Sequence, residues 1–199
     1  MDWERITALE PTREIEGERQ AAVLAPVITR STGPHLLFTK RAAHLGQHPG
    51  QMSFPGGGRE PEDDSLETTA LREAHEEIGL HPEEVDVVGC LDDIPTISGY
   101  GVRPFVATAP DREYVPNEHE VAEIAVLSLD ELTDLDNYRS ECRVHSERDD
   151  VRIHYFDVDG YTVWGATGRI LVQFLEVATD WEMPPEPDRY VDPDAEYQT

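Results

Sequence analysis

A glycine-rich loop that leads into an amphipathic helix, within residues 56–80, constrains the fold of this chain more than any other feature. Apolar residues recur at helical spacing after the loop, which predicts a helix with one buried face. Asp64 stands at the expected N-cap with Glu67 as its capping-box partner, and Gly79 provides a C-terminal stop. The predicted buried face consists of Leu66, Ala70, Leu71, Ala74 and Ile78.

The hydrophobic pattern places further elements on both sides of this helix. Runs rich in Val, Ala and Leu predict two earlier strands, at residues 20–29 and 35–41, with a turn at 32–34. Residues 45–64 contain too much Gly and Pro for a regular element and predict a long loop. After the helix we expect strands at 85–94, 101–109 and 121–129, a short helix at 129–135, and a hairpin turning near Asp159 and Gly160 before a closing helix.

The length of 199 residues suits one domain with appended ends. We expect an N-terminal extension or helix at residues 1–19 and the main domain at 20–180. Residues 181–199 form an acidic, proline-rich tail, which we expect to be poorly ordered.

The charge of the chain argues against several classes of partner. Its 42 Asp and Glu residues outnumber 16 Lys and Arg, and the formal net charge is -26 at pH 7. So acidic a protein is unsuited to nucleic acid or an anionic membrane. No stretch approaches the roughly 18–20 apolar residues of a membrane-spanning helix, and no signal peptide is recognisable, so we expect a soluble cytoplasmic protein. Cys90 and Cys142 lack a nearby partner, which predicts neither a disulfide framework nor a cysteine zinc site.

The distribution of the charges suggests a high-salt cytoplasm. Lys40 is the only lysine, and acidic residues run from one end of the chain to the other. Dense carboxylates keep a surface hydrated, and molar salt screens their repulsion to a Debye length of about 3 Å. We therefore hypothesise that the protein comes from a halophile.

Three glutamates on the predicted helix, Glu73, Glu76 and Glu77, are candidates for a metal site. Positions i, i+3 and i+4 share a helix face, so the carboxylates project side by side. Like charges there destabilise the helix unless a cation compensates them, and Mg2+ or Mn2+ prefers oxygen ligands and keeps waters that can be activated. The spacing alone also allows a second interpretation, in which the three acids simply face salty water.

The residues around these glutamates resemble the Nudix box, which is a glycine, five residues, an acid, seven residues and then REUxEExGU, with U aliphatic. The resemblance implies an α/β/α sandwich around a mixed β-sheet, in which the box forms a loop, a helix and a loop. It also implies hydrolysis of a diphosphate linked to another moiety, with Mg2+ or Mn2+ as cofactor. The family usually has Glu where this chain has Asp64, so we do not count Asp64 as a ligand. The matching positions are Gly58, Asp64, Arg72, Glu73, Glu76, Glu77, Gly79 and Leu80.

The same resemblance implies roles for the charged residues of the box. The three helix glutamates would hold the metal, and Arg72 would orient them through a salt bridge. Families of this kind recruit their general base from the box, where Glu76 is the candidate, or from a later loop. Glu118 and Glu120, just before the strand predicted at 121–129, are the candidates outside the box, and either could instead be a solvated loop acid.

The segment before the box narrows the substrate class. Residues 36–64 resemble the extended signature of the coenzyme A pyrophosphatase branch of the Nudix family, and residues 161–171 resemble its closing segment. This implies cleavage of coenzyme A or a derivative into adenosine 3',5'-bisphosphate and a 4'-phosphopantetheine fragment. Hydrolysis of ADP-ribose or another nucleoside diphosphate derivative is one alternative, and a catalytically silent module that binds a nucleotide or a protein partner is another. We therefore expect a small-molecule partner, and a homodimer is left open. The matches are Leu37, Thr39, Arg41, Leu45, His48, Gly50, Phe54, Pro55, Gly56 and Gly57.

A cluster of cations in this segment is the candidate binding site for the substrate. Coenzyme A is a polyanion, and on so negative a protein a local island of cations would admit it. Gly57 and Gly58, with Gly56, would let the backbone approach phosphate or adopt a positive φ. Arg41 could alternatively pair with a surface acid, and His48 could serve only as a cap for the loop. The cations of the island are Lys40, Arg41, His44, His48 and Arg59.

Overall fold

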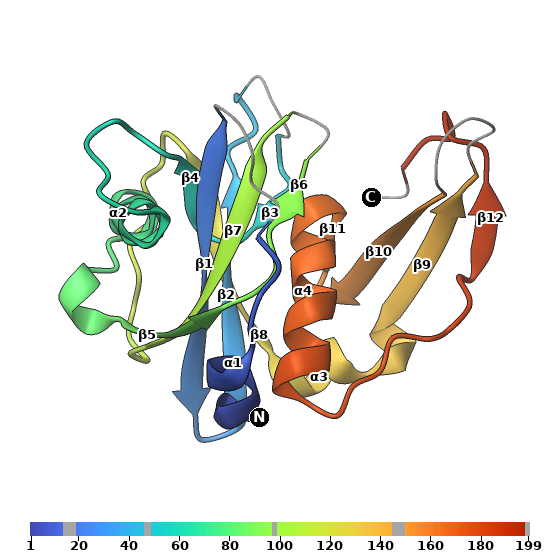
Figure 1. Cartoon of the computed structure of the whole chain (residues 1–199), viewed down its shortest axis with the longest axis horizontal. Coiled ribbons are helices and arrows are strands. Elements are labelled where there is room, and N and C mark those ends of the chain that lie inside the picture. Colours follow the sequence, from blue (N-terminus) through green and yellow to red (C-terminus); the bar gives the residue numbers. More distant parts are fainter. Residues whose placement is uncertain (14–18, 46–48, 97–98, 145–149, 198–199) are drawn as a thin grey trace.

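The computed structural model describes residues 1–13, 19–45, 49–96, 99–144 and 150–197 (Figure 1). An eight-stranded mixed sheet lies at the centre of these residues, with the path β3-β2-β1-β7-β5 and with β4, β6 and β8 paired to β1, β7 and β2. β1 and β7 run parallel, whereas β2 is antiparallel to both β1 and β8. The strands are β1 Gln20–Arg30, β2 Gly33–Arg41, β3 Met52–Ser53, β4 Gly56–Gly58, β5 Asp86–Cys90, β6 Ile94–Pro95, β7 Gly101–Ala109 and β8 Val121–Ser128.

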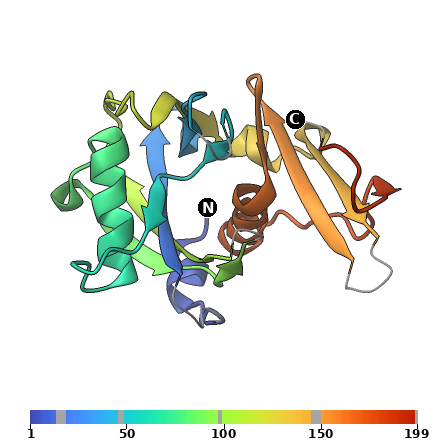
Figure 2. The same cartoon turned by 90° about the horizontal axis from the view of Figure 1, so that it is seen from above.

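Helices cover both faces of this sheet, so the α/β sandwich implied by the sequence is confirmed (Figure 1, Figure 2). Helix α2 (Leu66–Ile78) lies against one face, and α1 (Trp3–Ala8) and α4 (Gly165–Ala178) lie against the other. None of the described helices is long and apolar enough to cross a membrane. The short helical segments are η1 Pro82–Glu84, α3 Leu129–Thr133 and η2 Leu135–Asn137.

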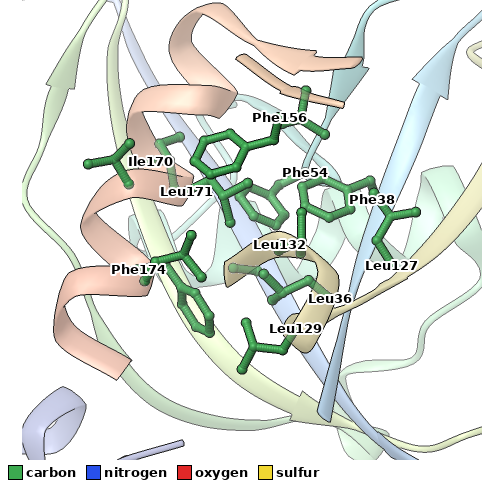
Figure 3. Packing of buried hydrophobic residues seen from close by; sticks show 14 of the residues in the cluster. Leu36, Phe38, Phe54, Leu127, Leu129, Leu132, Phe156, Ile170, Leu171 and Phe174 are labelled. Atoms are coloured by element: carbon green, nitrogen blue, oxygen red, sulfur yellow. The ribbon is translucent and has the colours of Figure 1, made fainter. Parts of the chain in front are cut away.

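The core on the α4 side fixes the end of β2 that leads to the candidate site. Phe38 of β2 stacks on Phe54, with ring centroids 4.6 Å apart, and Phe156 and Phe174 lie in the same cluster (Figure 3). Phe38 and Phe54 are 0% and 2% exposed, so each contributes about 2–3 kcal/mol of hydrophobic stabilisation. Because Phe54 lies between β3 and β4, this packing also holds those two strands in place.

Helix α2 begins one residue after the predicted position. Its N-cap is Ser65, whose hydroxyl accepts a hydrogen bond from the Thr68 N–H at 3.1 Å, and Asp64 lies exposed outside the helix. The prediction of Asp64 as the N-cap is wrong. Ser caps a helix as well as Asp does, and Ser65, the residue directly after Asp64, takes this position. The predicted end is confirmed, since Gly79 has a φ of 65 and its N–H bonds to the His75 carbonyl.

The segment predicted as a long loop, residues 45–64, contains two short strands. β3 pairs with β2, and β4, which consists of three glycines, pairs with β1. Glycine carries no strand propensity, so the sequence pattern conceals β4. Its missing side chain is nevertheless what permits the pairing, because a Cβ at Gly56 would lie 2.3 Å from the Ala22 carbonyl oxygen.

A second sheet lies beyond α4, and the sequence does not predict it (Figure 1). Its order is β11-β10-β9-β12. The predicted hairpin forms β10 and β11 and turns at Asp159 and Gly160, which both have positive φ. β9 escapes prediction because its alternating Arg139, Glu141 and Arg143 are typical of a solvated segment. The strands are β9 Tyr138–Arg143, β10 Val151–Val158, β11 Tyr161–Trp164 and β12 Arg189–Val191.

The acidic, proline-rich segment after Trp181 belongs to this second sheet, which corrects the expectation of a poorly ordered tail. β12 pairs in parallel with β9. Arg143 donates hydrogen bonds to the carbonyls of Pro193 and Ala195 at 2.9 and 2.7 Å, and Arg152 donates to further tail carbonyls. Charge-assisted hydrogen bonds of this kind offset the entropy lost when the tail is ordered.

Candidate active site

Arg72 of helix α2 joins the helix to the glycine loop. Its guanidinium donates to both Asp63 carboxylate oxygens, at 3.1 and 3.2 Å, and to the Gly58 carbonyl at 3.1 Å. It also pairs with Glu73 and Glu76, at 3.1 and 3.0 Å. The hydrogen bond from Arg72 lowers the pKa of Asp63 to about 2. Arg72 is therefore placed to hold two of the helix glutamates in fixed positions.

Asp63 belongs to this site, although the sequence does not reveal it. Its side chain is 3% exposed, and it accepts hydrogen bonds from the Thr69 hydroxyl and the Glu60 N–H, each at 2.9 Å. Asp64, which occupies the acidic position of the motif, is exposed. No sequence signal separates two adjacent aspartates. The N-cap at Ser65 decides between them, because it directs Asp63 inward.

Glu73 and Glu77 lie against the glycine strand β4. Glu77 is 4% exposed and accepts a hydrogen bond from the Gly56 N–H at 3.3 Å. Burial raises the pKa of Glu77 to about 8, because that hydrogen bond and the charge of Arg41 do not offset the lost hydration. Burial also raises the pKa of Glu73. A Cβ at Gly57 would lie 2.5 Å from a Glu73 carboxylate oxygen, so glycine is needed where the strand and the helix approach each other.

Glu120 and Arg41 approach these two glutamates from a second direction. Glu120 immediately precedes β8. Burial is the main cause of the raised pKa values of Glu73 and Glu77, and the charge of Glu120 raises both further. Arg41 ends β2, and the Ala42 N–H beside it donates to the Glu120 carbonyl at 2.8 Å. Within the part of the chain that the structure describes, the Nε of Arg41 is buried and has no hydrogen-bond partner. The acidic group of Glu73, Glu77 and Glu120 thus has an unsatisfied cationic donor beside it.

Glu76 lies apart from its two predicted companions. Its side chain is 53% exposed and pairs with Arg72, whereas Glu73 is 14% exposed. Neighbouring helix positions are about 100° apart, so the orientation that buries Glu77 leaves Glu76 at the rim. Among the described residues, no three His, Cys, Asp or Glu side chains form a ready-made metal cluster. Binding of one metal by Glu73, Glu76 and Glu77 together stays a prediction.

The acidic group nevertheless has the chemistry that suits a hard divalent cation. Burial is the main cause of the raised pKa values of Glu73 and Glu77, and the charge of Glu120 raises both further, so a positive charge is needed to compensate them. Mg2+ and Mn2+ take oxygen ligands of this kind. The space beside Glu73 that a Cβ at Gly57 would fill is kept clear by the glycine.

The structure divides the predicted island of cations. Arg41 acts on Glu77, but the Lys40 ammonium lies 3.6 Å from the Glu123 carboxylate and 5.7 Å from the centre of the Tyr161 ring. Successive residues of a strand point to opposite faces, and this alternation overrides their closeness in sequence. That Lys40 and Arg41 both bind the substrate stays a prediction, and the two side chains would meet different parts of it.

Of the remaining predicted substrate residues, Gly57, Gly58 and Arg59 lie in or directly after β4. Gly57 and Gly58 belong to this strand, and a Cβ at Gly58 would lie 3.9 Å from the ring of Tyr100, an aromatic that the sequence does not single out. Arg59 is held by hydrogen bonds to two neighbours. His48 lies outside the described residues.

Known proteins resemble this chain in sequence. The NUDIX domain family matches residues 18–145. A protein of Cronobacter sakazakii (strain ATCC BAA-894), described as an uncharacterized Nudix hydrolase NudL, is 41% identical over 170 residues, covering 84% of this chain and 88% of its own. A protein of the same description from Enterobacter sp. (strain 638) is 39% identical over 170 residues, with the same two coverages.

Two solved structures agree with the fold. A Nudix hydrolase from M. smegmatis, RenU, is 27% identical, covers 60% of this chain and 76% of its own, and gives a TM-score of 0.50. A MutT/nudix family protein from Enterococcus faecalis is 16% identical, covers 83% of this chain and 64% of its own, and gives a TM-score of 0.50, which supports the fold alone. The chain belongs to the Nudix hydrolases, which act on pyrophosphate bonds.

Proposed function

We propose that the protein is a metal-dependent Nudix pyrophosphohydrolase that cleaves the diphosphate of coenzyme A or one of its derivatives. The products are adenosine 3',5'-bisphosphate and 4'-phosphopantetheine or its acyl form. The observation that carries the proposal is the acidic group beside Gly57, where buried carboxylates lie next to a glycine strand that a phosphate can approach. The signature within residues 36–64 supports coenzyme A as the substrate.

We propose Mg2+ or Mn2+ as the cofactor, bound by Glu73 and Glu77 with Glu76 at the exposed rim. When bound, such an ion neutralises the diphosphate and lowers the pKa of the attacking water. Arg72 holds Glu73 and Glu76 in position through its ion pairs. The unsatisfied Nε of Arg41 is a donor for a diphosphate oxygen.

The reaction is a hydrolysis that needs no further reactant. The water oxygen bonds to one phosphorus, the bond from that phosphorus to the bridging oxygen breaks, and the bridging oxygen leaves with the other phosphate. We propose that Glu120 accepts the proton of the water, because it lies near Glu73 and Glu77 and is exposed to solvent. Glu76 is less suited to this role, since its carboxylate accepts a hydrogen bond from Arg72 at 3.0 Å.

We further propose that the protein works in a cytoplasm of high salt. Its net charge of -26 means that screening by salt should stabilise the fold. Thermal unfolding at low and at molar KCl measures this directly, and equal stability at the two concentrations would contradict a halophilic origin.

The function is tested by incubating the protein with coenzyme A, acyl-coenzyme A, ADP-ribose and NADH, at high salt with Mg2+ or Mn2+. We expect adenosine 3',5'-bisphosphate from coenzyme A or its acyl form, at a higher kcat/KM than for the other compounds. Preferred cleavage of ADP-ribose would overturn coenzyme A as the substrate. If none of the compounds is cleaved, the protein would instead be a catalytically silent binding module.

A further inference from the structure

A pocket of about 460 Å3 opens between the central sheet and the second sheet. Its walls come from the end of β2, from the segment just before β3, and from the hairpin of β10 and β11. The side chains that line it include Lys40, Gln51, Tyr161, Thr162 and Trp164. Its size falls within the range of about 300–1,000 Å3 that is usual for small-molecule sites.

The pocket and the acidic group meet at Arg41. The Gly50 N–H donates to the Arg41 carbonyl at 3.1 Å, and the Arg41 N–H donates to the Gln51 carbonyl at 3.0 Å. Gly50 and Gln51 both line the pocket, while the charge of Arg41 acts on Glu77. A ligand whose diphosphate lies at the acidic group can therefore extend past the end of β2 into the pocket.

The lysine of this pocket does not make it an anion site. The Lys40 ammonium lies 3.6 Å from Glu123, which also accepts a hydrogen bond from the Tyr161 hydroxyl. The charge of Asp159 acts on the same tyrosine. A phosphate entering here would meet a cation that is already paired and two nearby carboxylates, so repulsion would oppose its binding.

Neutral groups provide the rest of the lining. Tyr161 and Trp164 offer aromatic walls, and the Gln51 amide and the backbone of Gly50 and Gly160 offer hydrogen bonds without charge. A ligand that fits is an uncharged chain that carries both apolar carbons and amide groups. The pantetheine arm of coenzyme A has this composition.

Trp164 is also held in place before any ligand binds. Its ring stacks on that of Tyr155, with centroids 6.0 Å apart and an interplanar angle of 12°. The ring centroid of Tyr197, in the tail, lies 4.8 Å from that of Trp164. A wall that is already fixed loses little entropy on binding. We propose that this pocket binds the pantetheine arm of coenzyme A while the diphosphate lies at the acidic group, an inference that rests on the proposed function.

The test uses the two halves of the substrate as inhibitors of coenzyme A hydrolysis. Pantetheine and adenosine 3',5'-bisphosphate are titrated separately against the wild-type protein, against Trp164→Ala, which removes a wall, and against Gln51→Trp, which fills the pocket. We expect pantetheine to compete with coenzyme A, with an inhibition constant raised about tenfold in both variants by the loss of aromatic contact or of space. The inhibition constant of adenosine 3',5'-bisphosphate should not change.

Tyr190→Ala provides the control, because Tyr190 is 66% exposed on β12 of the second sheet. This variant should change neither inhibition constant. Thermal unfolding checks the folding of each variant, and Gln51→Trp carries the test if Trp164→Ala unfolds. Equal changes in the inhibition constants of the two inhibitors would overturn the assignment of the pocket to the pantetheine arm, and so would a lack of competition by pantetheine in the wild type. Neither result would contradict the proposed function. Wild-type protein that leaves coenzyme A intact would contradict the proposed function and this inference with it.

Discussion

Two buried carboxylates, Glu77 beside β4 and Glu141 in the second sheet, have opposite surroundings. Glu77 is 4% exposed and receives a backbone hydrogen bond at 3.3 Å, and burial raises its pKa to about 8. Glu141 is 1% exposed, and burial alone would raise its pKa as well. Hydrogen bonds from Arg189, Tyr155 and Arg143 outweigh that effect and lower the pKa of Glu141.

This difference distinguishes a structural carboxylate from a candidate metal ligand. A buried charge costs several kcal/mol unless partners compensate it. The fold itself supplies the partners of Glu141, among them Arg143 at 2.8 Å. It supplies far less to Glu77, so we infer that a cation from outside the chain is the missing partner. The following variants test whether the two acids differ in this way.

The largest expected effect is that of Glu77→Gln on turnover. The amide cannot compensate a bound cation, so we expect kcat for coenzyme A to fall about a thousandfold, or ~4 kcal/mol in activation free energy. Glu67→Gln is the matched control, because Glu67 is exposed in the first turn of the same helix. Steady-state kinetics at saturating Mg2+ measures both variants, and a near-normal kcat for Glu77→Gln would assign the essential carboxylate elsewhere.

The next effect in size is that of Glu141→Gln on stability. Removing this charge leaves the buried Arg143 uncompensated, so we expect the free energy of unfolding to fall by about 3 kcal/mol. The kcat of the folded fraction should stay at the wild-type value, because Glu141 neither lines the pocket nor belongs to the acidic group. Urea unfolding monitored by tryptophan fluorescence, together with kinetics, separates the two outcomes. A variant that keeps its stability but loses turnover would reverse the comparison.

A smaller effect comes from His154, whose Nδ1 lies 2.9 Å from the Tyr138 hydroxyl in the same second sheet. Burial lowers the pKa of His154 from 6.5 to about 4. The unfolded chain therefore binds the proton more tightly, and the stability that neutral His154 contributes is present above pH 6.5 and is lost as the pH falls towards 4.

We expect this titration to remove about 2 kcal/mol of unfolding free energy between pH 7 and pH 5. His154→Gln should abolish that part of the pH dependence while keeping a polar partner for Tyr138. Urea unfolding at the two pH values measures it. An identical loss in the wild type and the variant would show that other groups titrate instead.

The sequence predicts local features of this protein well and long-range ones poorly. The apolar stripe of α2 and its stop at Gly79 follow from neighbouring residues alone. β9 and β12 do not, because their pairing joins a charged segment to a tail far along the chain. The side chains of Lys40 and Arg41 point to opposite faces because they are neighbours in a strand, and a sequence motif does not record this alternation.

The acidic residues show the same limit at the scale of the site. Glu73 and Glu77 can be chosen from the motif, but their unequal burial depends on how α2 packs against β4. Which of the two adjacent aspartates meets Arg72 depends on the N-cap at Ser65. A one-dimensional pattern does not contain this information.

The binding of a divalent cation tests the central claim most directly. Thermal unfolding is measured with and without Mn2+ at constant high ionic strength, so that screening does not change. At a hundred times the dissociation constant, a bound ion should stabilise the wild type by about 2.7 kcal/mol. Glu67→Gln and Glu141→Gln should be stabilised by the same amount, and Glu77→Gln should not be stabilised. Equal stabilisation of the wild type and Glu77→Gln by Mn2+ would contradict the assignment of Glu77 as a metal ligand.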